Sequence, residues 1–555
     1  MRRITFWLVI FTVLQSLSSQ SNYVSKVWKS DNGDGTYKNP VIFADYSDPD
    51  VCRVGDDYYM TSSSFNCLPG LPILHSKDLI NWQIINHALL QQIPREDVEV
   101  PAVKFVTVRF QNGGVWAPAI RFHDGEFYIY YGDPDYGVFM LKTKDIRGEW
   151  EKPVLVKEGR GIIDPCPLWD EDGQVYLVHG IAGSRMTNRS LISVLRLSAD
   201  GKTAISDSRI VFDGHETQPT IEGPKFYKRN GYYYIFAPAG GVPTGWQTVL
   251  RSKNIWGPYE ERIVLSTGST KINGPHQGAW VDTPDGKEDW YFHFQEKGAY
   301  GRIVHLQPMK WINNWPVIGI DKDGDGCGEP VLTYKKPNVG KQYPVVNPVE
   351  SDEFNSRELG LQWQWHNISK PIWAYYASEK GFIRLYSVIP PTRKKFNNLL
   401  DNTNLLLQKI PAEEFSVVTK FTFKPHLNNT LGERAGFIVM GFAYTVLSVE
   451  NKNGKYVISQ STCTNANEGG QEIVNSSVSV TSDIFYFKLE MEKEAKCSFS
   501  YSIDGEKYIK IGTSFAVQKA RGTGSKIGLF CNRNEESIDA GWIDVDYFRV
   551  EKLTK

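Results

Sequence analysis

Residues 125–130 read Gly-Glu-Phe-Tyr-Ile-Tyr, and residues 173–178 read Gly-Gln-Val-Tyr-Leu-Val. In each stretch a turn glycine leads into aromatic and branched aliphatic residues, which favour a β-strand that follows a tight hairpin. The same pattern begins at Gly55, Gly231 and Gly286, so the units are spaced 48 to 70 residues apart. Strand-rich units that recur about every 40–50 residues are typical of a β-propeller with one blade per unit, and loops accept insertions. The repeat predicts five blades within residues 21–335.

A second feature precedes each hairpin glycine by seven to ten residues, where an upstream strand begins. The residues at these positions are Asp48, Trp116, Asp164, Glu222 and His276. The first strand of each propeller blade lines the central channel, so equivalent positions converge on the axis. We therefore expect three carboxylates, one histidine and one tryptophan to surround one pocket. The alternative is repeated turn chemistry without a site, because Asp-Pro and Glu-Gly-Pro favour turns.

Such a pocket suits one kind of chemistry. Carboxylates crowded in a partly desolvated site have their pKa values pushed apart, so that one serves as an acid and another as a base. Glycoside hydrolysis needs this pair, and a third carboxylate can orient the acid and raise its pKa. Trp116 offers a flat face for a sugar ring. The chain has no Gly-x-Ser-x-Gly, His-Glu-x-x-His or P-loop motif, so serine hydrolases, zincins and P-loop enzymes have no support.

The charge balance and the N-terminus restrict the partners and the location. The chain has 62 Lys and Arg against 63 Asp and Glu, so it lacks the basic excess of nucleic-acid-binding proteins. Met1-Arg-Arg precedes an apolar run over residues 4–14, which predicts a signal peptide over residues 1–20 and an exported, periplasmic or extracellular protein. The run is short for a membrane span, and a retained N-terminal anchor is the alternative.

An ordered series of short motifs runs through residues 39–330. They are Asn39-Pro-Val-Ile, Asp48-Pro-Asp-Val-Cys-Arg-Val-Gly-Asp-Asp-Tyr-Tyr, Pro69-Gly-Leu-Pro-Ile-Leu-His-Ser-Lys-Asp-Leu-Ile-Asn-Trp, Val115-Trp-Ala-Pro, Ile163-Asp-Pro, Ile221-Glu-Gly-Pro and Gly301-Arg-Ile. In this series the chain resembles glycoside hydrolase family 43. The resemblance implies a five-bladed propeller that hydrolyses glycosides with inversion.

The resemblance also implies a role for each pocket residue. Asp48 is the general base, Asp164 orients the acid and modulates its pKa, and Glu222 is the general acid. Arg302 contacts substrate hydroxyls or the base, and His276 corresponds to an axial histidine near a bound calcium or a water cluster. Because inversion places a water between the base and the sugar, we expect the Asp48 and Glu222 carboxyls to lie about 6.5–9.5 Å apart.

Two positions depart from related xylosidases. Phe65-Asn-Cys-Leu-Pro-Gly stands where a different aromatic segment is common, and Lys225 follows Glu222-Gly-Pro where histidine is common. Phe65 and Trp246 are predicted to stack on sugar, with a place in the core as the alternative for each.

The C-terminal half is predicted as a second β domain. A proline-rich linker over residues 336–350 precedes residues 351–555, where Phe415-Ser-Val-Val-Thr-Lys-Phe-Thr-Phe and similar runs alternate as half-buried strands do. About 200 such residues predict a β-sandwich. The start of this segment, from Asp352-Glu-Phe-Asn, resembles the concanavalin-like domain of family 43 xylosidases. In those enzymes a sandwich loop closes one side of the pocket, which implies action on chain ends.

No cofactor is required for the expected chemistry, and a structural calcium is the one metal considered. Asp352, Asp544 and Asp546 are its candidate ligands, with solvated strand ends as the equal alternative. The stretch Asp321-Lys-Asp-Gly-Asp-Gly begins like a calcium loop, but its twelfth position is Leu332 rather than Glu, which favours an acidic turn. The seven cysteines contain no CxxC pair; Cys52 and Cys67 could form a bridge, but buried free thiols are favoured.

Together these features predict an all-β protein, a five-bladed propeller followed by a concanavalin-like sandwich. The predicted function is that of an exo-acting β-xylosidase or α-L-arabinofuranosidase that releases xylose or arabinose from plant hemicellulose. A plant oligosaccharide or polysaccharide is the expected partner, with no nucleic acid and no membrane span, and no prediction is made of the oligomeric state. A non-catalytic sugar-binding propeller and an endo-arabinanase are the alternatives.

Overall fold

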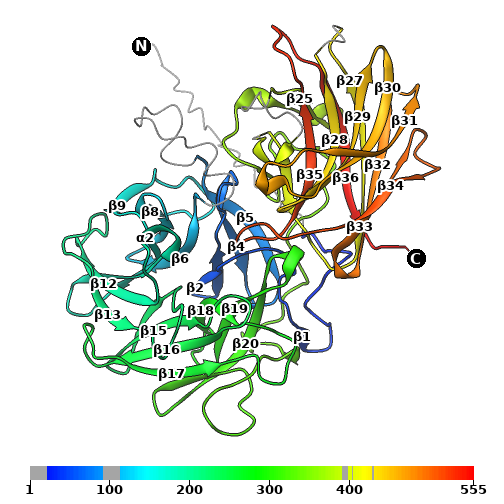
Figure 1. Cartoon of the computed structure of the whole chain (residues 1–555). Coiled ribbons are helices and arrows are strands. Elements are labelled where there is room, and N and C mark those ends of the chain that lie inside the picture. The colour runs from blue at the N-terminus through cyan, green and yellow to red at the C-terminus, as the bar shows by residue number, and fades with distance from the viewer. Residues whose placement is uncertain (1–21, 92–112, 390–397, 403, 428–430, 555) are drawn as a thin grey trace, which may run out of the picture.

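The computed structural model describes residues 22–91, 113–389, 398–402, 404–427 and 431–554. It consists of two β domains that lie side by side (Figure 1), a propeller coloured blue to green and a sandwich coloured yellow to red. The predicted signal peptide lies outside the described residues. Within them, no helix has both the length and the apolar character needed to cross a membrane.

The propeller has five blades in the part of the chain that is described, each a four-stranded antiparallel sheet in chain order, which confirms the predicted fold. The strands are β2 (Asp50–Val54), β3 (Asp57–Thr61), β4 (Gly70–Ser76) and β5 (Trp82–Leu89); β6 (Trp116–His123), β7 (Glu126–Asp133), β8 (Gly137–Thr143) and β9 (Val154–Glu158); β10 (Ile162–Trp169), β11 (Val175–Ile181), β12 (Leu191–Leu197) and β13 (Arg209–Asp213); β14 (Lys225–Arg229), β15 (Tyr232–Ala239), β16 (Trp246–Ser252) and β17 (Glu260–Leu265); and β18 (His276–Asp282), β19 (Asp289–Glu296), β20 (Arg302–Ile312) and β21 (Trp315–Ile318). The hairpin glycines lie between the first two strands of their blades with φ of 61° to 79°, a region that glycine adopts without strain.

The two ends of the propeller sequence meet and close the ring. β1 (Thr36–Lys38) pairs with β22 (Thr333–Lys335), and Ile42 bridges Val304 of blade five through two backbone hydrogen bonds of 3.1 and 3.3 Å. Behind this seam, Trp82 of blade one packs edge-on against Phe292 of blade five at 5.7 Å. The first and last blades are therefore held by both backbone and core.

The start of every inner strand carries one residue with left-handed backbone geometry, directly before a proline or glycine. These residues are Asp48 (φ 54°), Ala117 (φ 27°), Asp164 (φ 57°), Gly223 (φ 60°) and Gln277 (φ 34°). In blades two, three and five the strand register shifts at this point, as in a β-bulge, which redirects side chains. Asp48 and Asp164 are themselves the left-handed residues. Trp116, Glu222 and His276, which were expected to be equivalent to them, each lie one residue before the left-handed residue of their own blade. The pocket is thus lined from two neighbouring positions of the inner strands.

The sandwich consists, within the described residues, of two seven-stranded sheets, ordered β23-β26-β35-β28-β29-β30-β31 and β24-β25-β36-β27-β32-β33-β34. The strands are β23 (Gln364–Trp365), β24 (Ala374–Ala377), β25 (Phe382–Tyr386), β26 (Leu406–Lys409), β27 (Phe415–Lys424), β28 (Arg434–Met440), β29 (Tyr444–Lys452), β30 (Lys455–Cys463), β31 (Ile473–Val480), β32 (Ile484–Glu492), β33 (Lys496–Ser502), β34 (Ile509–Ala516), β35 (Lys526–Asn532) and β36 (Trp542–Glu551). Helical structure is short: α2 (Gly183–Met186), η1 (Gly298–Tyr300), η2 (Pro371–Trp373), η3 (Ser378–Lys380), η5 (Leu399–Asp401), η6 (Ala466–Glu468) and η7 (Lys493–Ala495).

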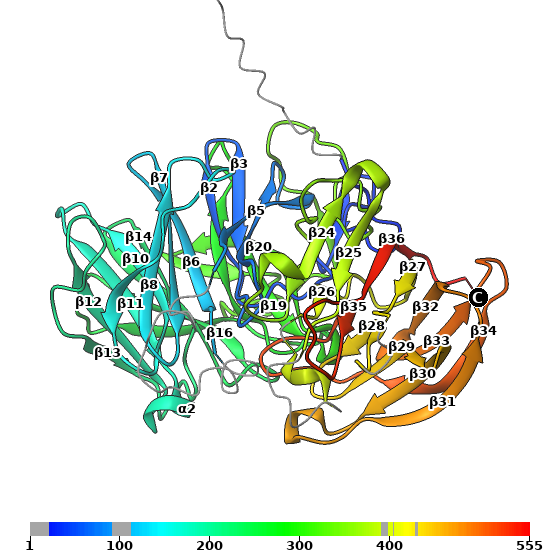
Figure 2. The ribbon, with the colours of Figure 1, turned by 90° about the horizontal axis from the view of Figure 1, so that it is seen from above.

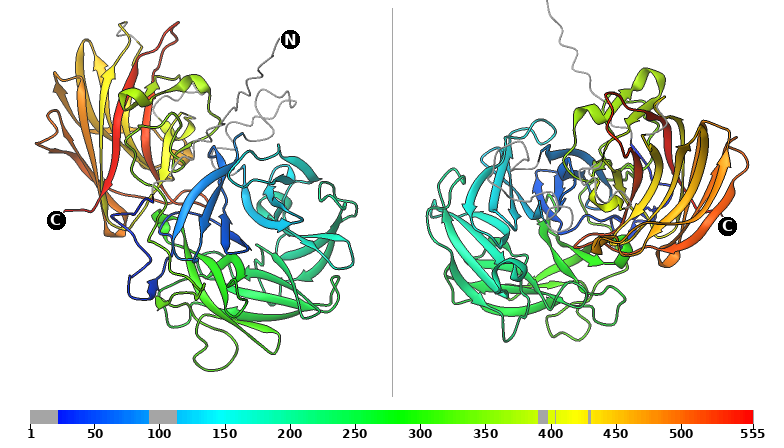
Figure 3. Two further views of the ribbon diagram at one scale, coloured as in Figure 1. Left: turned by 180° about the vertical axis from the view of Figure 1, so that it is seen from behind. Right: turned by 45° about the horizontal axis from the view of Figure 1, so that its top comes forward.

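The two domains share one buried core. Phe43 and Tyr300 of the propeller belong to the same hydrophobic cluster as Trp363 and Phe415 of the sandwich. The Tyr300 hydroxyl accepts a hydrogen bond from Ala495 N–H at 2.8 Å, and two backbone hydrogen bonds join Leu68 to Trp365 in β23. Views from above and from behind (Figures 2 and 3) show the sandwich against the first and last blades. This contact places sandwich loops beside the mouth of the propeller.

The cysteines, all of them in described residues, are free thiols, and every one except Cys327 is buried. Cys52 and Cys67 do not form a disulfide bridge, in agreement with the prediction of buried free thiols.

Candidate active site

The three predicted carboxylates come from blades one, three and four and meet at one end of the inner strands. Asp48 and Asp164 are 5% and 4% exposed, respectively. Asp164 Oδ2 accepts a hydrogen bond from Gly223 N–H at 2.8 Å, directly beside Glu222. The negative charges of both Glu222 and Asp48 act on Asp164. Side chains more than 170 residues apart in the sequence therefore form one acidic site.

Asp48 is held by two donors from different blades. Its Oδ2 accepts a hydrogen bond from Ser63 Oγ at 2.6 Å, and its Oδ1 lies 2.8 Å from Arg302 Nη1 in an ion pair. Ser63 Oγ in turn accepts a hydrogen bond from Ala117 N–H at 2.7 Å, which ties blade one to blade two. Both oxygens of Asp48 are thus oriented. Sequence reasoning found Arg302 but missed Ser63, which lies in a run of three serines without a recognisable motif.

Asp164 carries the raised pKa of the site. Burial, followed by repulsion from Glu222 and Asp48, raises the pKa of Asp164 from 3.8 to about 8. Lys225 lies at the start of β14, is fully buried, and donates from Nζ to the Pro118 carbonyl at 2.8 Å. Its positive charge offsets part of the repulsion at Asp164. This lysine, in place of the common histidine, therefore adds a cation beneath the carboxylates.

The pKa of Glu222 is lowered, whereas a raised pKa was expected for the general acid. Burial alone would raise the pKa of Glu222, but a hydrogen bond from His276 and the charges of His276, Arg302 and Arg189 together hold it below its usual value. His276 Nε2 lies 3.0 Å from Glu222 Oε1. The Glu222 side chain is 34% exposed, whereas Asp164 is nearly enclosed. If Asp164 and Glu222 share one proton, this geometry therefore places it on Asp164. Asp164 is repelled by two carboxylates and accepts from fewer donors than Glu222.

Trp116 and two arginines form the rim of the site. Trp116 is half-buried at the start of β6, next to Ala117, whose N–H binds Ser63. The Arg185 guanidinium lies 5.7 Å from the Trp116 ring and is fixed by Asp135 at 2.7 Å. Arg189, from the same loop after β11, is exposed and close enough to influence Glu222. One face of Trp116 is thus occupied by a cation, and neither arginine had a signal in the sequence.

A loop of the sandwich closes one side of the site. A Cβ atom placed on Gly522 would lie 3.2 Å from the Phe65 ring and 3.9 Å from Arg302 Nη2, so the loop backbone passes between these two side chains. Phe65 is positioned by a backbone bridge to Val115, with Phe65 N–H donating to the Val115 carbonyl at 3.0 Å. Phe65 therefore stands between the acidic site and the sandwich, as a wall residue.

Trp246 lies at a different place. It begins β16, the third strand of blade four, and its Nε1–H donates to Gln218 Oε1 at 2.8 Å. Its ring packs against Gly240 and the hydrophobic cluster between blades three and four. These contacts agree with the alternative of a place in the core, and the stacking of Trp246 on sugar stays a prediction.

The predicted metal ligands are not brought together. His276 uses Nε2 for Glu222, Asp544 is paired with Arg384 at 2.7 Å, and Asp546 is paired with Lys420. Asp352 accepts hydrogen bonds from Phe354 N–H and Trp363 Nε1–H. Calcium at Asp352, Asp544 and Asp546 stays a prediction, although Arg384 and Lys420 already supply a positive charge to two of these residues.

Among the described residues, a set of three possible ligands occurs at one acidic turn, that of Asp321, Asp323 and Asp325, whose ligand atoms lie within 4.8 Å of one another. Asp321 accepts hydrogen bonds from Gly324 N–H and Gly326 N–H, as expected of an acidic turn.

The family can now be established. A family model described as glycosyl hydrolases family 43 matches residues 37–316, and a second, described as the beta xylosidase C-terminal concanavalin A-like domain, matches residues 351–551. The chain belongs to glycosyl hydrolases family 43. This family 43 protein is a glycosidase, and both the resemblance seen in the sequence motifs and the predicted architecture are confirmed.

Relatives of this family 43 protein match along most of its length. One from Xylanibacter ruminicola is 39% identical over 91% of this chain and 88% of its own. A beta-xylosidase from Formosa agariphila is 33% identical over 94% of this chain and 91% of its own. A non-reducing end alpha-L-arabinofuranosidase from Bacteroides ovatus is 30% identical over 72% of this chain and 77% of its own. The solved structure of a xylan beta-1,4-xylosidase from Bacillus halodurans has the same fold, with a TM-score of 0.79 at 24% identity, over 93% of this chain and 100% of that chain.

Proposed function

We propose that this protein is an exo-acting, inverting glycosidase that releases xylose or arabinose from the non-reducing ends of plant hemicellulose. The observation that carries the proposal is a group of three carboxylates at the propeller axis, with the sandwich loop at Gly522 packed against Arg302, the partner of Asp48. We infer that this loop closes one side of the pocket. A pocket closed in this way accepts the end of a chain more readily than its interior, which disfavours an endo-arabinanase. Two relatives bear the names beta-xylosidase and alpha-L-arabinofuranosidase, which supports both sugars.

Three carboxylates divide the reaction among them. Asp48, oriented by Ser63 and Arg302, takes a proton from a water whose oxygen attacks the anomeric carbon. Glu222 gives its proton to the glycosidic oxygen as the bond to the sugar breaks. Asp164 accepts from Gly223 N–H and so fixes the backbone beside Glu222. The products are a sugar with inverted configuration and the shortened chain. Carboxylates and water suffice, so the proposed chemistry requires no cofactor.

The proton that Glu222 donates is shared between the carboxyl groups of Glu222 and Asp164. Two carboxylates that interact strongly titrate together rather than singly. Because the pKa of Asp164 is about 8 and that of Glu222 lies below its usual value, the pair carries one proton at neutral pH. The acid role of Glu222 requires this proton to lie on Glu222 when the leaving oxygen arrives. The proposed mechanism therefore includes transfer of this proton from Asp164 to Glu222 before the glycosidic bond breaks.

Leaving-group chemistry tests these roles. Glu222→Gln is expected to lower kcat/KM for xylobiose by roughly 10³-fold, and much less for 2,4-dinitrophenyl β-xyloside, whose leaving group needs little protonation. Asp48→Asn should lower kcat/KM for both substrates alike, because both need the attacking water. Proton NMR of the first sugar released reports its anomeric configuration. Equal losses for the two substrates in Glu222→Gln, or a retained configuration, would contradict the proposal.

The substrate and the location are tested separately. Digestion of arabinoxylan, arabinan and xylo-oligosaccharides should release monosaccharides from the start, and early oligosaccharide products would indicate endo action. A protein that binds xylo-oligosaccharides without cleaving them would favour the non-catalytic alternative. We also propose that the protein is exported, on the pattern of residues 1–20. N-terminal sequencing of the mature protein should then begin near residue 21.

A further inference from the structure

Asp45 lies three residues before Asp48, is 4% exposed, and has no part in the roles assigned above. Its carboxylate accepts hydrogen bonds from both domains. On the propeller side, Oδ1 accepts from Ser47 Oγ at 2.8 Å and from Arg302 N–H at 2.9 Å. On the sandwich side, Oδ2 accepts from Gly524 N–H at 2.9 Å and from the Thr523 hydroxyl. A single side chain therefore joins the sandwich loop to the residue that holds Asp48.

The two backbones touch at this point. Gly301, directly before Arg302, has a φ of 79°. A Cβ atom placed on it would lie 2.5 Å from Asp45 Cγ and 2.6 Å from Gly524 N, and one placed on Gly524 would lie 2.5 Å from Gly301 N. Real Cβ atoms are not found so close to other atoms, so glycine is required on both sides. The backbone of Arg302 and the sandwich loop consequently cannot move independently.

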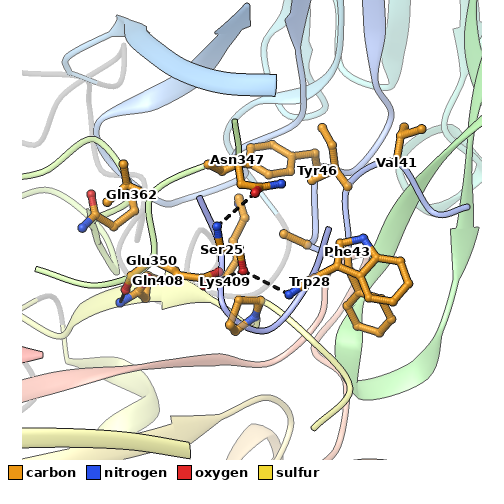
Figure 4. A pocket seen from close by; sticks show the side chains of 15 residues that line it. Ser25, Trp28, Val41, Phe43, Tyr46, Asn347, Glu350, Gln362, Gln408 and Lys409 are labelled. Carbon is orange, nitrogen blue, oxygen red and sulfur yellow. Dashed lines mark hydrogen bonds between the residues drawn. The ribbon is translucent and has the colours of Figure 1, made fainter. Parts of the chain in front are cut away.

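Two lysines of the sandwich keep Asp45 charged. Burial alone would raise the pKa of Asp45, but the charges of Lys409 and Lys526, together with its hydrogen bonds, hold the pKa below 3.8. Lys409 lies 5.0 Å from the Tyr46 ring and lines a small cavity of about 50 Å³ between the N-terminal segment and the sandwich (Figure 4). An ionised carboxylate offers acceptor sites to all four donors, which a neutral one does less well.

From this arrangement we propose that Asp45 is a positioning residue for catalysis: it joins the loop at Thr523 and Gly524 to the backbone of Arg302, and so sets the Arg302 guanidinium against Asp48. The sandwich thereby acts on the chemistry as well as closing the pocket. This inference rests on the proposed function, in which Asp48 is the base. Ser47 strengthens the link, because its carbonyl accepts from Ser63 N–H at 2.9 Å and Ser63 also orients Asp48.

Thr523 provides the cleanest test, because it belongs to the sandwich and its hydroxyl binds Asp45 rather than any of the three carboxylates. Thr523→Val keeps the shape and removes the hydroxyl, and should lower kcat for xylobiose about tenfold while KM changes less than twofold. Thr523→Ser restores the hydroxyl and should bring kcat back to within twofold of the wild type. Asp45→Asn, which turns an acceptor into a donor, should lower kcat about 100-fold, since a small misplacement of a catalytic group is that costly.

Asp78→Asn is the matched control. Asp78 is a buried aspartate of blade one that accepts from Ile80 N–H and Asn81 N–H and has no contact with the pocket. It should lower the Tm without changing kcat. The inference is overturned if kcat of Asp45→Asn and Thr523→Val stays at the wild-type value. It is also overturned if kcat falls in these variants only together with a loss of Tm as large as that of Asp78→Asn.

Amide hydrogen exchange separates this inference from the proposed function. In Thr523→Val, exchange at the amides of Gly524 and Arg302 should become faster in both domains at once. Unchanged exchange at Arg302 would overturn the coupling, whether or not the wild-type protein cleaves the sugars. A wild-type protein that cleaves none of them, yet shows the coupled exchange, would contradict the proposed function alone.

Discussion

Asp164 and Asp45 are the same residue type, in the same domain and equally buried at 4% exposure, yet their pKa values move in opposite directions. At the axis of the propeller, burial and two neighbouring carboxylates raise the pKa of Asp164 to about 8. At the junction with the sandwich, the pKa of Asp45 falls below 3.8 despite its burial, because two lysines and several donors surround it. Burial alone therefore does not decide the protonation of a carboxylate; the neighbouring charges and donors do.

The difference separates two functions of buried aspartates in the same domain. A site that must deliver a proton gathers like charges, which keeps a proton bound at neutral pH. A junction that must stay fixed gathers donors, which keeps the carboxylate ionised and fully hydrogen-bonded. Asp48, proposed as the base, accepts hydrogen bonds from one hydroxyl and one guanidinium.

The largest expected effect concerns the crowded site. Asp164→Asn should lower kcat/KM by roughly 10²–10³-fold, because the acid loses the group that shares its proton. In the wild type, activity should fall as the pH rises through about 8, when the pair loses its proton. In the variant this alkaline limb should move to lower pH. A pH profile of kcat/KM checks both statements, and an unchanged alkaline limb in the variant would remove Asp164 from the pair.

The next effect is a difference in how the stabilities of Asp164→Asn and Asp45→Asn depend on pH. The folded-state pKa of Asp164 is raised, so its contribution to stability is present below pH 3.8 and is lost as the pH rises through about 8. Asp164→Asn should therefore gain on the order of 1 kcal/mol or more over the wild type between pH 4 and pH 8. The pKa of Asp45 is lowered, so Asp45→Asn should lose about 1–3 kcal/mol at pH 7, and less below pH 3.8. Tm values measured from pH 3 to pH 8 give both trends, and trends of the same sign would contradict the comparison.

A smaller effect is expected at Glu350, a third buried carboxylate, which faces the N-terminal segment. Burial raises the pKa of Glu350 from 4.5 to about 7, although Ser25 Oγ donates to it at 2.7 Å. Stability from this group is present below pH 4.5 and is lost as the pH rises through about 7. Glu350→Gln should therefore weaken the dependence of the free energy of unfolding on pH between 5 and 8, by about 1 kcal/mol over that range, and the Tm should vary less with pH. A Glu350→Gln protein whose Tm depends on pH as in the wild type would contradict the assignment.

The smallest effect distinguishes two tryptophans. Trp116→Phe, at the rim of the pocket, should raise KM a few-fold, because a smaller ring offers less stacking area. Trp246→Phe should leave KM within twofold and lower the Tm slightly, since Trp246 packs inside blade four and donates to Gln218. Steady-state kinetics on xylobiose measure both. A larger change in KM for Trp246→Phe would return Trp246 to the substrate-binding residues.

Much of this protein could be predicted from the sequence, where the signal is local and repeated. The hairpin glycines at Gly55, Gly125 and their equivalents marked the blades, because a positive φ at a tight turn leaves a residue-level signal. The residues that orient the carboxylates left none. Ser63 binds Asp48 and Ala117, and Thr523 binds Asp45 of the other domain. Serine and threonine are common residue types, and the spacing of these pairs follows no motif.

The sequence by itself determined the five-bladed architecture, the sandwich and the three carboxylates proposed to carry the reaction, since periodic turns and strands are encoded within a few tens of residues. Only the tertiary structure decided how the protons are divided. The raised pKa lies on Asp164 rather than Glu222, and two acidic residues named as metal ligands are paired with Arg384 and Lys420. Protonation and ion pairing depend on distances between groups from different blades and domains, and such distances exist only after the chain has folded.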